Sequence, residues 1–170
     1  MAVREVLKYP NDILKQDAAD VTELTDEVKQ IIQDLKDTML DAGHSTGIAA
    51  PQIGILKRII TIDASRNKKC KENHGFMVMI NPEIVEHSGT ITSREGCMSV
   101  PDFTGNVTRA ERIVVSCFDE NMQQTVLETS GFEAILIQHE TDHLNGMLFI
   151  DRVISKRTDL FRRKKYQGAV

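Results

Sequence analysis

Two histidines and a glutamate in the pentapeptide His139-Glu140-Thr141-Asp142-His143 have types and spacing suited to metal chemistry. On a helix, residues four apart lie one above the other on one face, so both imidazoles can bind the same metal ion. Glu140, directly after the first histidine, can then reach a water on that ion. A metal that lowers the pKa of bound water toward neutrality, with a carboxylate that moves the proton, forms a hydrolytic centre.

The residues around the pentapeptide predict the helix that this chemistry requires. Ser130 and Glu133 have the spacing of a capping box at a helix start. The segment from Phe132 to Leu144 contains neither proline nor glycine, and Asn145-Gly146 supplies a stop signal. The segment is apolar on most sides, which predicts a buried helix, where the polar groups of the pentapeptide are costly unless paired or bound to metal. The alternative is a surface helix with ordinary histidines.

A catalytic site of this kind usually takes three protein ligands, so a third donor is needed. Neither a histidine nor a glutamate follows His143, which leaves Asp151 as a weak downstream candidate. Upstream, Cys97 lies between a glycine and a nearby proline, and a thiolate beside two imidazoles suits zinc or ferrous iron. Cys97 is therefore the preferred third ligand. The remaining cysteines are expected in a lysine-rich loop and in a buried strand, at Cys70 and Cys117.

Three segments of the chain resemble those of one enzyme family, peptide deformylase. These are Gly47 to Gln52, Glu95 to Ser99, and Gln138 to Leu144, and their order and separations also fit the family. The similarity extends from near the N-terminus to about Ile154. The resemblance implies a metal-dependent hydrolase that removes the formyl group from the N-terminal formyl-methionine of newly synthesised polypeptides and releases formate.

The resemblance also implies roles for individual residues. Glu140 would be the general acid and base, and the Gln52 side-chain amide and the Met98 backbone N–H would hold the oxyanion. One divalent ion per chain is implied, typically ferrous iron in this family, with zinc, nickel or cobalt as replacements. Three residues would hold that ion, namely Cys97, His139 and His143.

Two departures from the family pattern concern substrate binding. The first segment usually opens Gly-x-Gly, and here Ser45-Thr46-Gly47 stands in its place. If the first glycine requires a positive φ, Ser45 must tolerate it or the loop must differ. The stretch from Asp102 to Asn106 lacks an arginine found there in some members, so we expect a shift in side-chain preference.

Several residues are expected to position these groups or to contact substrate. Asp142 is expected to orient a group on the helix, with a surface salt bridge as the alternative, and Glu95 is expected to pair with Arg109 and brace the segment of the third ligand. An extended substrate would add as a strand near Gly47 and Gly96. A methionine pocket is expected to be lined by Ile48, Ile135, Leu136 and His139.

Length and composition are those of an ordinary globular protein. The 170 residues are 41% hydrophobic and 27% charged, which predicts one catalytic domain over 1–170. We expect a monomer. No run of about 18 apolar residues occurs, so we expect no membrane span, and the N-terminus lacks a signal-peptide core. Three cysteines form no disulfide framework, which favours the cytoplasm. The net charge of −4 argues against general nucleic-acid binding.

The segment 152–170 differs from the rest in charge. Within it, seven basic residues accompany one acidic residue, Asp159, up to Lys165. We expect a basic C-terminal helix that touches ribosomal RNA near emerging chains. The alternative is a solvated helix face.

Periodicity elsewhere predicts the remaining elements. Thr25 can cap a first helix that ends near Gly43. The resulting class is α+β, with antiparallel sheets packed around a central metal-binding helix, an N-terminal helix and a C-terminal helix. A metallopeptidase using Asp151, or a metal-binding module without activity, are the alternative functions. The expected strands are Arg58–Asp63, Phe76–Asn81, one or two within Glu83–Ser93, and the hairpin Arg112–Phe118 with Gln123–Thr129.

Overall fold

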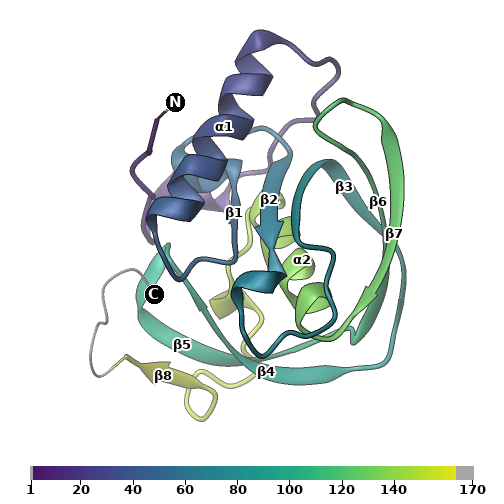
Figure 1. Ribbon diagram of the computed structural model, residues 1–170. Helices are drawn as coiled ribbons and strands as arrows, with labels where there is room; N and C mark the ends of the chain where they lie inside the picture. Colours follow the sequence, from purple (N-terminus) through teal and green to yellow (C-terminus); the bar gives the residue numbers. More distant parts are fainter. Residues whose placement is uncertain (1, 164–170) are drawn as a thin grey trace.

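Two helices and two antiparallel sheets make up the computed structural model, which describes residues 2–163 (Figure 1). In this part of the chain, the larger sheet has the strand order β1-β2-β3-β6-β7 and the smaller has the order β4-β5-β8. The predicted α+β class with antiparallel sheets is confirmed. The helices are α1 (Asp26–Asp41) and α2 (Gly131–Leu144); the strands are β1 (Gly47–Ala49), β2 (Ile59–Asp63), β3 (Phe76–Ser88), β4 (Ile91–Cys97), β5 (Val100–Arg109), β6 (Arg112–Phe118), β7 (Gln124–Ser130) and β8 (Leu160–Arg162).

Helix α1 begins where the sequence predicts. The Thr25 side chain accepts a hydrogen bond from the Val28 backbone N–H at 3.1 Å, which satisfies one of the free donors at the helix start. The apolar stripe of α1 is buried against β1 and β2, where it meets Ile48 and Ile59 in one core cluster. This helix therefore covers β1 and β2, at one end of the larger sheet.

Helix α2 lies at the centre of the molecule, in contact with β1, β2, β6 and β7 (Figure 1). Most of its residues are buried, as its nearly uniform apolar surface predicts. Ser130 occupies the N-cap position, but its side chain makes no capping hydrogen bond, so the predicted capping box is wrong. The Glu133 carboxylate instead accepts hydrogen bonds from Thr129 Oγ1 at 2.9 Å and from the His74 backbone N–H at 2.7 Å.

The predicted strands are present, but two differ in extent, because β4 continues past Ser93 to Cys97 and β3 is longer than expected. β2, β6 and β7 agree with prediction to within one residue, and β6 and β7 form the expected hairpin. β3, however, continues through Asn81 and Pro82 to Ser88, with irregular pairing that lets it bend. Gly89, with φ of +68°, then turns the chain from the larger sheet into the smaller one.

Strands β1 and β4 each form the outer edge of their own sheet. β4 ends in a tight hairpin with β5, in which Cys97 pairs with Val100. Both edge strands line the same cavity: β1 contributes Gly47, and β4 contributes Cys97. Backbone edges of two sheets therefore border the same space.

The prediction of a C-terminal helix over 152–170 is wrong for the described residues. A 3₁₀ turn (Phe149–Asp151) and further turns lead to β8, which pairs with β5 through Phe161 and Thr104. β5 offers an open edge, and the apolar pair Leu160-Phe161 suits a strand there. Residues 164–170, including Lys164 and Lys165, lie outside the described residues. Within 2–163, no helix has the length and apolar character needed to span a membrane.

Candidate metal centre and active site

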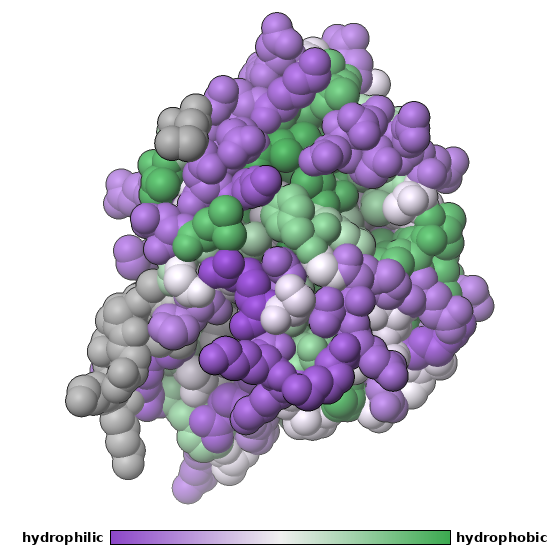
Figure 2. All heavy atoms as spheres, in the orientation of Figure 1, coloured by the Kyte–Doolittle hydropathy of each residue, from purple (hydrophilic) through white to green (hydrophobic). Residues whose placement is uncertain are grey.

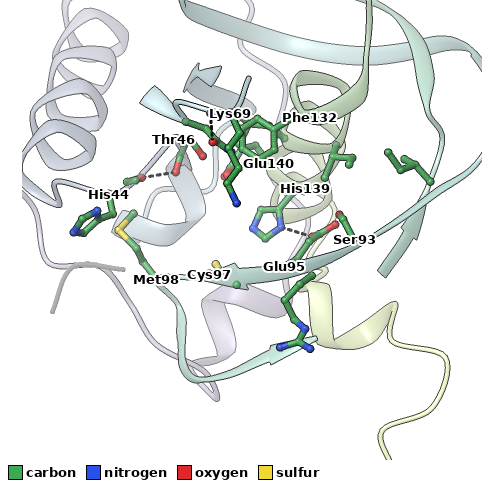
Figure 3. Close-up of a pocket in the computed structure, with 18 of the residues that line it drawn as sticks. His44, Thr46, Lys69, Ser93, Glu95, Cys97, Met98, Phe132, His139 and Glu140 are labelled. Atoms are coloured by element: carbon green, nitrogen blue, oxygen red, sulfur yellow. Dashed lines mark hydrogen bonds and ion pairs between the residues drawn. The ribbon is translucent and has the colours of Figure 1, made fainter. Parts of the chain in front are cut away.

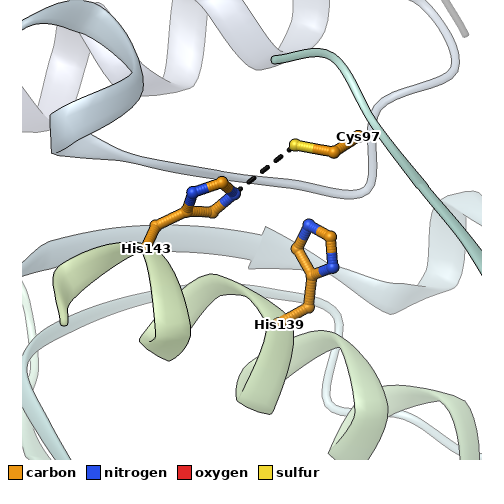
Figure 4. A group of neighbouring side chains, drawn as sticks. All are labelled: Cys97, His139 and His143. Carbon is orange, nitrogen blue, oxygen red and sulfur yellow. Dashed lines mark hydrogen bonds between the residues drawn. The ribbon is translucent and has the colours of Figure 1, made fainter. Parts of the chain in front are cut away.

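Three potential metal ligands from two elements meet beside α2. His139 and His143 lie one turn apart on α2, and Cys97 is the last residue of β4. Their donor atoms lie within 4.8 Å of one another, and Cys97 Sγ is 3.5 Å from His143 Nε2 (Figure 4). All three side chains are buried. One thiol and two imidazoles in this arrangement fit a divalent ion such as zinc or ferrous iron and leave a position for water.

The two imidazoles are held in different ways. His139 Nδ1 lies 2.8 Å from Glu95 Oε1, which leaves its other nitrogen on the side of the neighbouring ligands. Burial and the adjacent His139 hold the pKa of His143 well below its usual range. A neutral imidazole is the form that donates to a metal.

Behind His139, buried charges form a continuous chain of ion pairs. Arg109 donates to Glu95 through two nitrogens, at 2.6 and 2.9 Å, and to Asp142 Oδ2 at 2.9 Å. Arg152 completes the chain by pairing with both oxygens of Asp142. Burial raises the pKa of Glu95, but hydrogen bonds from His139 and Arg109 outweigh it and lower that pKa to about 2.

This chain decides between the two interpretations of Asp142. Its side chain is only 7% exposed and bridges two arginines, so a simple surface salt bridge is excluded. The expected pair between Glu95 and Arg109 is present. Because Glu95 also contacts His139, the pair connects β4 and β5 to the helix that carries both histidines.

Glu140 projects into the same space with an oxygen that lacks a partner. Its Oε1 atom is buried, has no hydrogen-bond partner among the described residues, and lies 4.0 Å from His143 Nε2. Burial raises the pKa of Glu140 to about 7. An uncompensated buried carboxylate is costly, so its position next to three metal-ligand atoms fits a neighbouring cation.

Gly47 allows this approach of β1 to the carboxylate. A Cβ atom at position 47 would lie 2.9 Å from Glu140 Oε2 and 3.0 Å from Leu136 Cδ1, so the Glu140 carboxylate or β1 would have to shift. The neighbouring Ser45 does not adopt a positive φ, so the loop follows ordinary backbone geometry without the family's usual glycine. The Ser45 hydroxyl donates to the Gly47 carbonyl at 2.9 Å.

Gln52 lies beside the thiol of Cys97 rather than in an ordinary loop. It belongs to a 3₁₀ turn (Ala50–Ile53) and is 1% exposed. Its Nε2 atom lies 3.0 Å from Ser99 Oγ and 3.5 Å from Cys97 Sγ, while its Oε1 accepts from the Ala49 backbone N–H at 3.0 Å. Its amide N–H group therefore points at the metal-ligand cluster.

A cavity of about 610 Å³ opens onto these groups (Figure 3). Phe132, Ile135 and Leu136 of α2 form an apolar wall, and Gly96 and Met98 lie on the side of β4. The expected lining by Ile135, Leu136 and His139 is observed. The expected lining by Ile48 is wrong. Strand residues alternate between faces, and the Ile48 side chain packs into the core with α1 while Gly47 faces the cavity.

Several residues near the site were missed from the sequence. Ser99 contacts both Gln52 and Cys97, Phe149 stacks on His139 at 6.3 Å between ring centroids, and Arg152 holds Asp142. Ser99 is the last residue of a recognised segment and could have been included. Phe149 and Arg152 reach the site only through the turns after α2, for which the sequence carries no clear signal.

The weaker ligand candidates lie elsewhere. Asp151 pairs with Lys15 at 3.0 Å, with its side chain 34% exposed. Cys117 is a buried residue of β6, as expected, and Cys70 is partly buried in the segment between β2 and β3. The ligand cluster found among the described residues contains Cys97 and neither of these thiols.

Comparisons with known proteins bear on the identity of this site. The family model described as polypeptide deformylase matches residues 3–159. Peptide deformylase of Thermodesulfovibrio yellowstonii is 40% identical over 164 residues, covering 96% of this chain and 97% of that protein. Peptide deformylase 1 of Bacillus subtilis is 39% identical over 159 residues, covering 94% of this chain and 95% of that protein.

Solved structures agree with these relatives. A class I type b peptide deformylase from Acinetobacter baumannii, with Met-Ala-Ser bound, superposes with a TM-score of 0.83 at 38% identity, covering 89% of this chain and 99% of that one. A peptide deformylase from Synechococcus elongatus in complex with actinonin gives a TM-score of 0.82 at 37% identity, covering 91% and 80%. The chain belongs to the polypeptide deformylase family.

Proposed function

We propose that Cys97, His139 and His143 hold one divalent metal ion and that Glu140 carries protons during hydrolysis. The reaction itself follows from family membership: the enzyme removes the formyl group from the N-terminal formyl-methionine of newly synthesised polypeptides. The observation that supports the roles is the buried cluster of three donors with the partnerless Glu140 oxygen beside it.

Glu140 has the properties of a general acid and base. A divalent ion held by the cluster would polarise the formyl carbonyl and lower the pKa of a water toward neutrality. Glu140 accepts a proton as water attacks the formyl carbon, and then passes a proton to the departing amine as formate leaves. In the metal-free protein burial raises the pKa of Glu140 to about 7, and a cation held by the cluster would lower this pKa and favour the carboxylate that accepts the proton.

Gln52 and Met98 are proposed to stabilise the oxyanion. The Gln52 amide is fixed through its oxygen by the Ala49 backbone, so its N–H group remains directed toward Cys97. The Met98 backbone N–H follows Cys97 directly, at the start of the hairpin turn. Loss of one such donor typically raises the barrier by about 3 kcal/mol.

The two free strand edges are proposed to hold the peptide as an added strand. The Thr46 carbonyl accepts from the Asp63 N–H at 2.7 Å, so alternation along β1 turns the backbone groups of Gly47 toward the free edge. Gly96 lies on the opposite border, on the outer strand β4. The side chain of formyl-methionine would then lie against the apolar wall of Ile135 and Leu136.

The chain of ion pairs is proposed to position His139. Glu95 fixes the orientation of this imidazole, while Arg109 and Asp142 keep Glu95 charged and in place. Such partners usually raise metal affinity by 10- to 100-fold.

We propose ferrous iron as the physiological metal, since it is typical of the family, with zinc, nickel or cobalt able to replace it. A thiolate with two imidazoles accepts both iron and zinc. The test is anaerobic purification with metal analysis, followed by activity after exposure to air. Loss of iron together with activity is expected, whereas full activity of an air-stable zinc form would contradict the assignment.

We further propose a single catalytic domain over 1–170 that acts as a cytoplasmic monomer. Its three cysteines are not joined in disulfides, which suits a reducing compartment. We also propose a ribosome contact through β8 and the residue after it. Arg162 and Arg163 are the cationic side chains that the structure describes there. Replacing both with glutamate should weaken co-sedimentation with ribosomes at low salt, and unchanged co-sedimentation would remove the idea.

The decisive test of function is formate release from formyl-Met-Ala-Ser. Cys97→Ala should abolish metal binding, while Asp151→Ala should leave metal and activity intact. A metallopeptidase using Asp151 predicts the reverse, and would also cleave unformylated Met-Ala-Ser. A non-catalytic metal module would bind metal and release no formate.

A further inference from the structure

The hydroxyl group of Ser99 is buried between the two groups that are proposed to stabilise the oxyanion. Hydrophilic side chains cover much of the surface, as Figure 2 shows for one face of the molecule. Ser99 instead has no exposed surface. It lies in the turn between β4 and β5, directly after Met98. A buried polar group is costly unless it is hydrogen-bonded, so the partners of this hydroxyl indicate what it does.

Ser99 holds one side of the Gln52 carboxamide. Gln52 Nε2 donates to Ser99 Oγ at 3.0 Å, and Gln52 Oε1 accepts from the Ala49 backbone N–H at 3.0 Å. A backbone N–H can only donate, so the amide oxygen must face Ala49 and the amide nitrogen must face Ser99. The NH₂ group carries two hydrogens in a fixed plane, and Ser99 accepts one of them. The other remains directed at the ligand cluster, where Cys97 Sγ lies 3.5 Å from Nε2.

The backbones of Gln52 and Ser99 are held together by one short N-terminal segment. The Leu7 N–H donates to the Gln52 carbonyl at 2.7 Å, and the Tyr9 N–H donates to the Ser99 carbonyl at 2.7 Å. The Leu7 side chain also packs against the apolar cluster that contains Cys97. Two N–H groups of the same segment therefore hold the 3₁₀ turn of Gln52 beside the hairpin of Ser99.

The backbone and the side chain of Ser99 have different partners. Its backbone N–H lies 3.4 Å from Cys97 Sγ, whereas its hydroxyl contacts Gln52. Substitution by alanine removes the hydroxyl and keeps the backbone N–H. One substitution therefore separates the contact with Gln52 from the contact with the thiol.

We propose that Ser99 is a positioning residue that accepts one N–H of Gln52 and thereby directs the other toward the formyl oxygen. The inference rests on the proposed function, in which Gln52 and the Met98 N–H stabilise the oxyanion. An amide free to rotate would at times turn its own oxygen toward the developing negative charge. Ser99 and Ala49 together prevent that orientation, so the donor needs no reorganisation during the reaction.

NMR relaxation of side-chain NH₂ groups in the zinc-loaded, unsubstituted protein tests the anchoring directly. We expect the Gln52 amide to be as rigid as that of Gln138, whose Nε2 donates to the carbonyls of Ala110 and Ala134. The exposed Gln124 serves as the mobile reference. A Gln52 amide as mobile as that of Gln124 would overturn the proposal without any substitution.

Kinetics of formate release from formyl-Met-Ala-Ser test the consequence. Ser99→Ala should lower kcat about tenfold, with KM and metal content nearly unchanged. Gln52→Ala should lower kcat about 100-fold. Because Ser99 acts through Gln52, adding Ser99→Ala to Gln52→Ala should lower kcat less than about twofold further. Ser99→Thr keeps the hydroxyl and should recover most of the rate.

Thr38→Val is the matched control for the loss of a buried hydroxyl. Thr38 Oγ1 donates to the Asp34 carbonyl on α1 at 2.7 Å, and this residue does not line the cavity. The control should leave kcat unchanged, whatever its effect on the melting temperature. A loss of kcat equal to that of Ser99→Ala would mean that reduced stability, rather than the direction of the Gln52 amide, explains the effect.

Failure of this inference can be told apart from failure of the proposed function. Unchanged kcat in Ser99→Ala, with the loss in Gln52→Ala observed, would overturn the role of Ser99 alone. Equal losses from Ser99→Ala with and without Gln52 would also overturn it. Unchanged kcat in Gln52→Ala would contradict the proposed oxyanion role and this inference with it. No formate from the unsubstituted enzyme would contradict the proposed function as a whole.

Discussion

Charged side chains in the interior of the site and at its mouth are arranged in opposite ways. In the interior, Glu95, Arg109 and Asp142 are buried and joined by hydrogen bonds of 2.6 to 2.9 Å. At the mouth, Lys69 and Arg94 are exposed and border open space. Buried charges that satisfy one another hold geometry, whereas exposed charges are screened by water and contribute little to stability. Glu140 belongs to neither group, since it is buried with an oxygen that has no described partner.

The largest effect on activity should come from replacing Glu140. Glu140→Gln keeps the shape of the side chain and removes its ability to accept a proton, so kcat should fall by about 10³-fold or more. Formate release from formyl-Met-Ala-Ser measures this loss. Metal content should stay near one ion per chain, because Glu140 is not one of the three donors. Retained activity would show that the partnerless carboxylate has no role in proton transfer.

Gly47→Ala should be nearly as damaging through the same carboxylate. The added methyl group would lie 2.9 Å from Glu140 Oε2, so either β1 or the carboxylate must move. A displacement of about 1 Å at the reacting groups can lower kcat by about 10²-fold. The melting temperature and metal content of the variant serve as controls. Unchanged kcat would mean that Glu140 relocates without consequence.

Glu95→Gln tests whether buried ion pairs contribute more to stability than exposed ion pairs do. Arg109 would keep a buried charge with a weaker partner, so the free energy of unfolding should fall by about 3 kcal/mol. Metal affinity should fall about 10- to 100-fold, because His139 loses its anionic partner. Glu128→Gln is the matched control, since Glu128 pairs with Arg112 on the surface with 61% of its side chain exposed. The control should cost under about 0.5 kcal/mol, and equal effects would erase the distinction.

A comparable loss of stability is expected when the metal-free protein is acidified. The pKa of Glu95 in the folded state is lowered to about 2 from an ordinary value of 4.5, so its contribution to stability is fully present above about pH 4.5. That contribution should decline as the pH falls toward 2, by up to about 3 kcal/mol. Denaturant unfolding across this range should give a shallower pH dependence for Glu95→Gln than for the unsubstituted protein. Parallel curves would contradict the assignment.

Sequence reasoning succeeded where the signals are local. The segment from Phe132 to Leu144 has the period, composition and stop signal of a buried helix, and α2 ends at Leu144. Thr25 lies directly before a regular apolar stripe and caps α1. Gly96 and Pro101 flank Cys97 closely and favour it as the third ligand. In each case the relevant residues lie within a few positions of one another.

It failed where distant partners compete for a residue. The spacing of Ser130 and Glu133 predicts a capping box, but Thr129 and His74 occupy the Glu133 carboxylate. The position of Ile48 shows the cost of an error of one residue, because neighbouring strand residues face opposite sides. The local sequence shows neither the partners of the Glu133 carboxylate nor the face of β1 on which the Ile48 side chain lies.

The C-terminal segment shows the same limit on a larger scale. Its basic composition is compatible with a helix, yet the open edge of β5 offers backbone partners that the local sequence does not reveal. Arg152, within that segment, is drawn instead to Asp142 on α2. The basic composition of this segment therefore does not determine whether it forms a helix or a strand.

The tight hairpin after β4 limits where a polypeptide can be processed. The edge of β4 ends at Cys97, and the chain reverses at once to pair Cys97 with Val100. If a peptide adds along this edge as proposed, it runs out of pairing partners at the ligand cluster, and its first residue would then lie at the reacting groups. On that proposal, the hairpin would favour the beginning of a chain over internal peptide bonds.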